Sequence, residues 1–153
     1  HLLTIRQCYS KTDHFDNYMG FFEEVYSTEW FFLSDLNIKI IFFLLEQFGA
    51  SCVVYKSSEK KWAHLKTGLL AELCAEYGVD TYLQGQGGKE YTDVELMKSR
   101  GVSVFTSDFK HPSYAQQFKP FLPNMSSIDL LFNYGPKARE VLLSCTSHTQ
   151  DQQ

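Results

Sequence analysis

Short β-branched and aromatic runs alternate with helical stretches in the second half of the chain, and this alternation is the strongest constraint on the fold. The runs predicted as strands are Cys52–Tyr55, Thr81–Leu83 and Val102–Phe105. The helices predicted between them are Thr67–Tyr77, ended by Gly78, and Thr92–Ser99, ended by Gly101. Strands that alternate with helices of about ten residues indicate βαβ units and a parallel sheet.

The first third of the chain follows a helical period instead. His1–Tyr9 has the pattern of the end of a helix, and Asp13 can cap a second helix that runs to about Tyr26. A third helix is predicted from Ser34 to Phe48, with a glycine at its C-cap. This third helix is apolar nearly all round, so we expect other elements to cover it on several sides.

An irregular stretch is marked by Pro112, Pro120 and Pro123, and a last helix follows it. Ser126 and Asp129 resemble a capping box at the start of that helix, which Gly135 interrupts. The predicted fold class is therefore α/β, with a small mostly parallel sheet, flanking helices and a helical N-terminal part. We expect residues 1–145 to form a single domain and residues 146–153 to form a disordered tail.

Composition excludes several classes of protein. A net charge of −4 and a pI near 5.7 make nucleic acid an unlikely partner, because phosphate binding needs clustered Lys and Arg. The longest apolar run, Ile40–Leu45, is far shorter than the roughly 20 residues of a membrane span, so we expect no such span. The four cysteines show neither CxxC nor metal-ligand spacing, which predicts free, mostly buried thiols, no metal site and a cytoplasmic protein. No cofactor is indicated.

The segment Gly85–Asp93 places three glycines between a predicted strand and a predicted helix. Ligands bind at this edge in open α/β sheets. Gly85, Gly87 and Gly88 would let the backbone approach a ligand, and Lys89 would attract a phosphate or carboxylate. The spacing matches neither the dinucleotide fingerprint nor the P-loop. A turn that needs glycine for its dihedral angles therefore explains the segment equally well.

Two further groups of polar residues are candidates. Pro112 favours an extended backbone at His111, which would lie near Lys89 and Tyr91 if the two predicted strands are neighbours. His111 could then act as a general base or acid, although a lone histidine more often has a structural role.

Asp129 and Asn133 are i, i+4 neighbours and share one face of the last helix. A polar pair that points into a site is one interpretation of them. A capping carboxylate beside a solvated amide is the interpretation that physics alone favours. The remaining candidate nucleophile, Cys74, has no basic partner nearby in the sequence and is assigned to the core.

Three ordered motifs resemble those of the WbqC-like family. The motifs are Tyr82-Leu83-x-Gly85-x-Gly87-Gly88-Lys89-x-Tyr91-x-Asp93, Phe109-x-His111-Pro112-x-Tyr114, and Phe121-x-Pro123-Asn124-x-Ser126-x-Ile128-Asp129-Leu130-Leu131-Phe132-Asn133. The opening segment, Leu2–Phe15, resembles the family as well. The sequence departs from the family pattern at Gln84, Gln86 and Ala115, and none of these changes removes a candidate chemical group.

The resemblance implies the C-terminal portion of a longer protein of bacterial surface-polysaccharide (O-antigen, lipopolysaccharide) biosynthesis. Within that pathway, our first hypothesis is a transferase that adds an acyl or aminoacyl group to a nucleotide-linked amino sugar, because the glycine segment with Lys89 suits an anionic ligand and His111 can deprotonate the amine. His111 is then the base, Asp129 orients it, and Tyr91 hydrogen-bonds the substrate. The residues expected to bind substrate are Gly85, Gly87, Gly88, Lys89, Asp93 and Asn133.

Two other functions stay open. One is a non-catalytic module that binds a nucleotide sugar or organises pathway partners, which needs the glycine segment but not His111. The other is nucleotidyl or glycosyl transfer, for which no carboxylate cluster suggests the metal. The aromatic segment Tyr26–Phe32 predicts packing against a missing N-terminal portion or against a second copy in a homodimer.

Overall fold

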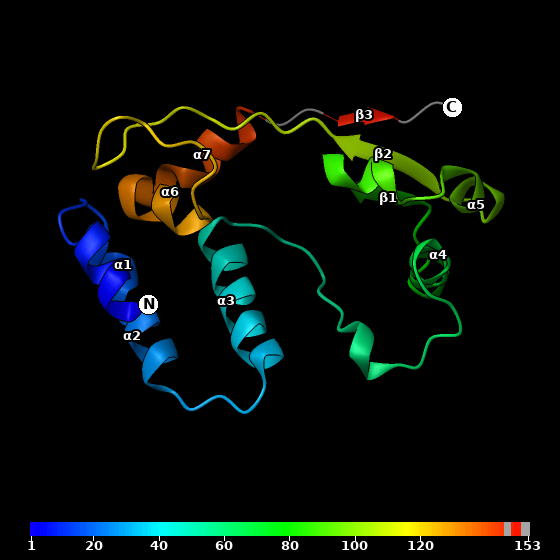
Figure 1. The fold of residues 1–153 in the computed structure, drawn as a ribbon, viewed down its shortest axis with the longest axis horizontal. Coiled ribbons are helices and arrows are strands. Elements are labelled where there is room, and N and C mark those ends of the chain that lie inside the picture. Colours follow the sequence, from blue (N-terminus) through cyan, green and yellow to red (C-terminus); the bar gives the residue numbers. More distant parts are fainter. Residues whose placement is uncertain (146–147, 151–153) are drawn as a thin grey trace. The chain divides into compact units, whose positions relative to one another are not determined.

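The structure is a computed structural model that describes residues 1–145 and 148–150 (Figure 1). The chain forms two compact units. Unit 1 comprises His1–Val53 and His111–Cys145, and unit 2 comprises Val54–Lys110 together with the described residues 148–150. Each unit is described by itself. The expectation of a single domain stays a prediction.

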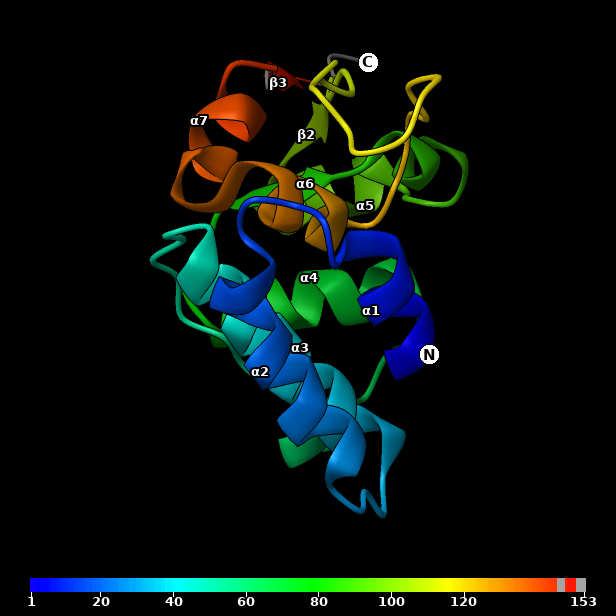
Figure 2. The ribbon, with the colours of Figure 1, turned by 90° about the vertical axis from the view of Figure 1, so that its left-hand side faces the viewer.

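Unit 1 is helical. Its elements are α1 (Leu2–Tyr9), α2 (Phe15–Ser27), α3 (Leu33–Gln47), α6 (Ser127–Tyr134), the 3₁₀ turn η3 (Gly135–Lys137) and α7 (Ala138–Leu143). Figure 2 shows this part of the molecule, in which α1 lies beside α2 and α2 contacts α6. The predicted helical N-terminal part is therefore confirmed.

An aromatic core on α6 organises unit 1. Phe132 is fully buried, and its ring stacks on Tyr9 at 4.7 Å between centroids. Tyr18 and Phe22 of α2 contact the same ring at 6.1 and 5.8 Å. Aromatic pairs at these distances bury large areas of apolar surface and prefer stacked or edge-on geometry. One α6 side chain thus joins the two N-terminal helices to the C-terminal part of unit 1.

Unit 2 contains the sheet. Its elements are η1 (Ser57–Glu59), α4 (Thr67–Glu76), β1 (Thr81–Gln84), η2 (Gln86–Glu90), α5 (Val94–Ser99), β2 (Ser103–Ser107) and β3 (His148–Gln150). β1 pairs in parallel with β2, from Thr81 opposite Ser103 to Gln84 opposite Thr106, and β3 is antiparallel to β2. The predicted α/β fold, with a small parallel sheet and helices, is confirmed.

The helices of unit 2 pack on the sheet through buried apolar residues. Cys74 of α4 and Met97 of α5 are buried with Val104 of β2. Gly78 and Gly101 follow the two helices with positive φ angles of 64° and 76°, which accounts for a glycine at each predicted helix end. Only Cys74 of the four cysteines is buried, so the expectation of mostly buried thiols is wrong.

Two local predictions are wrong. The run Cys52–Tyr55 is irregular and exposed rather than a strand, because β-branched composition forms a strand only where a neighbouring strand pairs with it. α3 has no buried residue, although it is apolar nearly all round. Only one side of α3 packs within unit 1, as in the stack of Phe43 on Phe21 of α2, while Ile41 and Phe42 are about half exposed.

The ends of the helices differ in detail from the sequence pattern. α2 begins at Phe15 after His14, so Asp13 does not cap it as predicted. No helix in the described part of the chain is long and apolar enough to cross a membrane. Residues 146–147 and 151–153 of the predicted tail lie outside the described residues. His148–Gln150 form β3, and disorder of the remaining tail stays a prediction.

Replacement of the central aromatic ring tests the core of unit 1. We expect Phe132→Ala to lower the free energy of unfolding by about 3–5 kcal/mol, because it removes a fully buried ring and leaves a cavity. The matched control, Phe42→Ala, removes a ring that is 50% exposed and is expected to change stability by less than about 1 kcal/mol. Urea unfolding followed by circular dichroism measures both; equal losses would contradict the assignment of this core.

Candidate functional site

Unit 1 contains a buried carboxylate, that of Asp129. Asp129 lies in the first turn of α6, where a carboxylate usually caps the helix. Its side chain instead accepts hydrogen bonds from the Tyr114 hydroxyl at 2.8 Å and from the Gln116 side-chain amide at 3.0 Å. The residue is only 6% exposed. Asp129 is therefore held by neutral donors from the preceding loop, and the capping-box interpretation of this residue is wrong.

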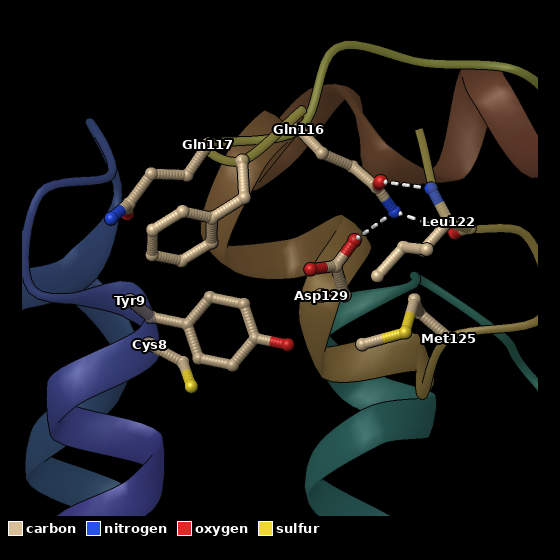
Figure 3. Close-up of a pocket in the computed structure, with 8 residues that line it drawn as sticks. Cys8, Tyr9, Gln116, Gln117, Leu122, Met125 and Asp129 are labelled. Carbon is tan, nitrogen blue, oxygen red and sulfur yellow. Dashed lines mark hydrogen bonds between the residues drawn. The ribbon is translucent and has the colours of Figure 1, made fainter. Parts of the chain in front are cut away.

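A pocket of about 190 Å³ opens beside this carboxylate (Figure 3). Its lining comes from α1, from the loop before α6 and from α6 itself. The lining residues are Cys8, Tyr9, Gln116, Gln117, Phe118, Leu122, Met125 and Asp129. Figure 3 shows the Tyr9 hydroxyl and the Asp129 carboxylate pointing toward each other. The pocket thus has a polar end at Asp129 and walls that are mostly apolar, with the amides of Gln116 and Gln117 among them.

The two tyrosines at the polar end are held in their neutral form. Burial, with the Asp129 carboxylate beside the hydroxyl, raises the pKa of Tyr9 well above its usual value. Burial and then the hydrogen bond to Asp129 raise the pKa of Tyr114 to about 12. Both phenols can therefore donate hydrogen bonds across the neutral pH range, and neither adds a second negative charge.

Gln116 closes the loop that forms one wall of the pocket. Its side-chain oxygen accepts from the Leu122 backbone N–H at 2.8 Å, and its amide donates to the Leu122 carbonyl at 2.9 Å. The same amide donates to Asp129 (Figure 3). One side chain therefore fixes both the carboxylate and the two ends of the loop that carries Phe118.

His111 belongs to the aromatic surroundings of this site. Its ring centroid lies 6.1 Å from that of Tyr114 and 6.0 Å from that of Phe121. Tyr114 therefore contacts both His111 and Asp129. The predicted role of Asp129 in orienting His111 stays a prediction, and the hydrogen bonds described for the carboxylate go to Tyr114 and Gln116.

Asn133 shares the helix face of Asp129, as i, i+4 spacing requires. Its side-chain amide donates to the Asp129 backbone carbonyl at 2.7 Å. This bond turns the amide toward its own helix. A contact of Asn133 with substrate stays a prediction.

The glycine segment lies in unit 2, where the 3₁₀ turn η2 directly follows β1. Gly88 is buried, and a Cβ atom there would come within 2.9 Å of the Gln84 Cβ atom. Gly85 and Gly87 face open space. None of the three has a positive φ angle, so the need for a left-handed backbone conformation does not explain why they are glycines. Close packing requires glycine at position 88, while the other two leave exposed backbone that a ligand can approach.

Thr67 of α4 holds the far end of this segment. Its hydroxyl accepts from the Asp93 backbone N–H at 3.1 Å and donates to the Tyr91 carbonyl at 3.4 Å. The Asp93 carboxylate accepts from the Leu96 backbone N–H at 2.9 Å and caps α5. Lys89 and Tyr91 are exposed. Asp93 therefore has a structural role, and its contact with substrate stays a prediction.

The sequence-predicted residues thus fall into two groups. Unit 1 contains His111, Asp129 and Asn133, whereas unit 2 contains the glycine segment with Lys89, Tyr91 and Asp93. The pocket adds Tyr9 and Gln116, to which the sequence analysis gave no role. Tyr9 lies in the opening segment, and the resemblance of that segment to the family could have identified it as a candidate site residue. Among the described residues, no group of three or more His, Cys, Asp or Glu side chains could hold a metal ion.

Comparisons with known proteins identify similar sequences. The family model described as "WbqC-like protein family" matches residues 1–141. Uncharacterized protein Rv1507c of Mycobacterium tuberculosis is 29% identical over 139 residues, which cover 90% of this chain and 60% of that protein. The chain therefore spans about three-fifths of the length of this curated relative. No solved structure gives a significant match.

The raised pKa of Tyr114 predicts a loss of stability at high pH. The pKa in the folded chain, about 12, is above the ordinary value of 10, so the stabilising effect is complete below pH 10. As pH rises from 10 to about 12, the unfolded chain loses a proton that the folded chain keeps, and the free energy of unfolding falls. Urea unfolding at successive pH values should therefore give a shallower fall for Tyr114→Phe than for the wild type. Equal slopes would contradict the assignment.

Proposed function

Because the chain belongs to the WbqC-like protein family, we propose that it forms part of a cytoplasmic enzyme of bacterial surface-polysaccharide biosynthesis. The proposed reaction transfers an acyl or aminoacyl group to the amine of a nucleotide-linked amino sugar. The family resemblance implies the pathway, and the pocket in unit 1 supports a small-molecule site. The O-antigen of lipopolysaccharide is the proposed destination of the product.

One observation carries the proposal: the first and third segments with family resemblance meet at one pocket, and the second holds the carboxylate of that pocket. Tyr9 of the opening segment and Asp129 of the third motif are 120 positions apart and both line the pocket. Tyr114 of the second motif donates a hydrogen bond to the Asp129 carboxylate. A module that only organised partners would not need a hydrogen-bonded carboxylate at the end of a pocket. Concave sites with a few convergent polar groups are typical of small-molecule binding.

The size of the pocket limits what enters it. Sites for whole drug-sized ligands are commonly about 300–1,000 Å³, so a pocket of 190 Å³ holds only part of a nucleotide sugar. We place the amine-bearing part of the acceptor there. Lys89, with the open backbone at Gly85 and Gly87, is the proposed binding place for an anionic group such as a phosphate.

The chemistry needs an activated acyl donor, a thioester or an ester. The amine nitrogen attacks the carbonyl carbon, a C–N bond forms, and the C–S or C–O bond to the leaving group breaks. A proton leaves the nitrogen for a base and then reaches the departing sulfur or oxygen. We propose His111 as that base, Asp129 as the group that fixes its surroundings through Tyr114, and Tyr91, Asp93 and Asn133 as substrate contacts.

Removal of the proposed base tests the reaction. We expect His111→Ala to lower turnover by about 10²–10⁴-fold while the folded structure is kept, since general bases contribute about that much. Mass spectrometry of nucleotide amino sugars incubated with acyl thioesters or aminoacyl esters measures the product. The control, Lys110→Ala, changes an exposed neighbour and is expected to retain turnover. Full turnover in His111→Ala would contradict the role of His111.

The alternative, a non-catalytic module that binds a nucleotide sugar, rests on the open backbone at Gly85 and Gly87 beside Lys89. Under either function, a nucleotide amino sugar at a hundredfold excess over its Kd should stabilise the protein by about 2.7 kcal/mol in a thermal-shift assay. Lys89→Ala should abolish this shift. The control, Lys98→Ala, changes another exposed lysine of unit 2 and should leave the shift unchanged.

Binding without product from any donor would favour the alternative function. Absence of a shift with every nucleotide amino sugar would contradict both functions and leave the glycine segment as a structural turn.

A further inference from the structure

We infer that the pocket beside Asp129 binds the ammonium group of a ligand whose adjoining atoms are apolar. The inference rests on the proposed function, because it names the chemical class that this same pocket accepts. It assigns recognition of the ligand charge to Asp129, with Tyr9 as a further contact and Tyr114 as the residue that holds the carboxylate.

The buried carboxylate of Asp129 has no cationic partner among the described residues. Asp129 is 6% exposed, and its described hydrogen-bond donors, Tyr114 and Gln116, are neutral. Within the described part of the chain, no Lys, Arg or His side chain forms an ion pair with it. A carboxylate removed from water is costly unless a cation pairs with it. The pocket is the place from which a ligand can supply that cation.

The polar end of the pocket supplies hydrogen-bond acceptors. An ammonium group has three donors and no acceptor, so it needs several acceptors close together. The two oxygens of the Asp129 carboxylate are acceptors, and the Tyr9 hydroxyl, which points toward the same carboxylate, has an oxygen that can accept as well (Figure 3). Tyr114 holds the carboxylate by its own hydrogen bond. A neutral Tyr9, which its raised pKa ensures, leaves Asp129 as the single charge there.

The remaining lining decides what the ammonium group is attached to. Phe118, Leu122, Met125 and Cys8 form most of the other walls, Gln117 adds an amide, and none of them carries a charge. An apolar cavity of about 150 Å³ can hold a benzene molecule. A volume of about 190 Å³ therefore suits one six-membered ring or a short aliphatic group that bears the amine.

A purely structural role for Asp129 makes a different prediction. If the carboxylate served only to tie Gln116 and the loop that ends at Leu122, the pocket would prefer neutral ligands, because a buried cation would gain nothing. Two molecules of the same shape, one charged and one neutral, distinguish these roles.

The test compares cyclohexylamine, which is protonated at neutral pH, with cyclohexanol. Binding is followed by the NMR shift of the Met125 methyl group in protein labelled with ¹³C at the methionine methyls. Met19 lies in the core of unit 1 and Met97 in unit 2, so both serve as internal references. We expect the amine to shift Met125 and to bind at least about tenfold more tightly than the alcohol, because a charge-assisted hydrogen bond replaces a neutral one.

Two variants separate charge from shape. Asp129→Asn keeps the size of the side chain and an acceptor for Tyr114, so we expect it to remove the preference for the amine. Asp35→Asn removes the same charge from an exposed position of unit 1 and should leave the preference unchanged. If Asp129→Asn does not fold, the relative affinity of the wild type for the amine and the alcohol still distinguishes ligand binding from a structural role of Asp129.

Equal affinity for amine and alcohol, or no shift of Met125 with either, would overturn the inference. No acyl donor is present in this experiment, so its outcome is independent of turnover. Selective binding of the amine without transfer from any donor would support the inference and contradict the proposed reaction. Transfer activity without a preference for the amine probe would support the proposed reaction and contradict the inference.

Discussion

The hydrogen bonds to the Asp129 carboxylate are the interactions on which the site depends. Tyr114 and Gln116 donate these hydrogen bonds and so join the loop before α6 to that helix, while the hydroxyl of Tyr9, from the distant helix α1, faces the same carboxylate. A carboxylate in the first turn of a helix normally satisfies the free N–H groups of that turn. The Asp129 carboxylate instead accepts hydrogen bonds at the end of the pocket, and these hydrogen bonds fix the conformation of the loop before α6.

The aromatic core offsets the free-energy cost of burying the Asp129 carboxylate. Asp129 and Phe132 lie on the same short helix, the first at the pocket and the second fully buried against Tyr9 and Tyr18. Burial of a carboxylate is costly, and burial of aromatic surface contributes in the opposite sense. The Tyr9 side chain takes part in both, because its ring stacks in the core while its hydroxyl reaches the pocket. Stability and site geometry therefore depend on the same residues.

The glycine segment shows a second kind of constraint. Glycine is required at position 88 because the Gln84 side chain packs against it, and the segment ends where Thr67 holds the backbone around Asp93. Gly85 and Gly87, which come just before these fixed points, leave their backbone open. Because the residues that follow are held in place, the open backbone can present N–H groups to an anion without losing its shape.

The sequence by itself determined the class of fold, the order of the helices and the two parallel strands, because apolar periodicity and helix-ending glycines act over a few residues. It also identified His111 and Asp129 as polar residues outside the usual pattern. Only the tertiary structure decided what depends on partners distant in the chain. Cys52–Tyr55 has strand composition without a strand to pair with, and α3 is apolar on sides that nothing in unit 1 covers. The pocket belongs to the same category, since 120 residues separate Tyr9 from Asp129 and no local pattern brings them together.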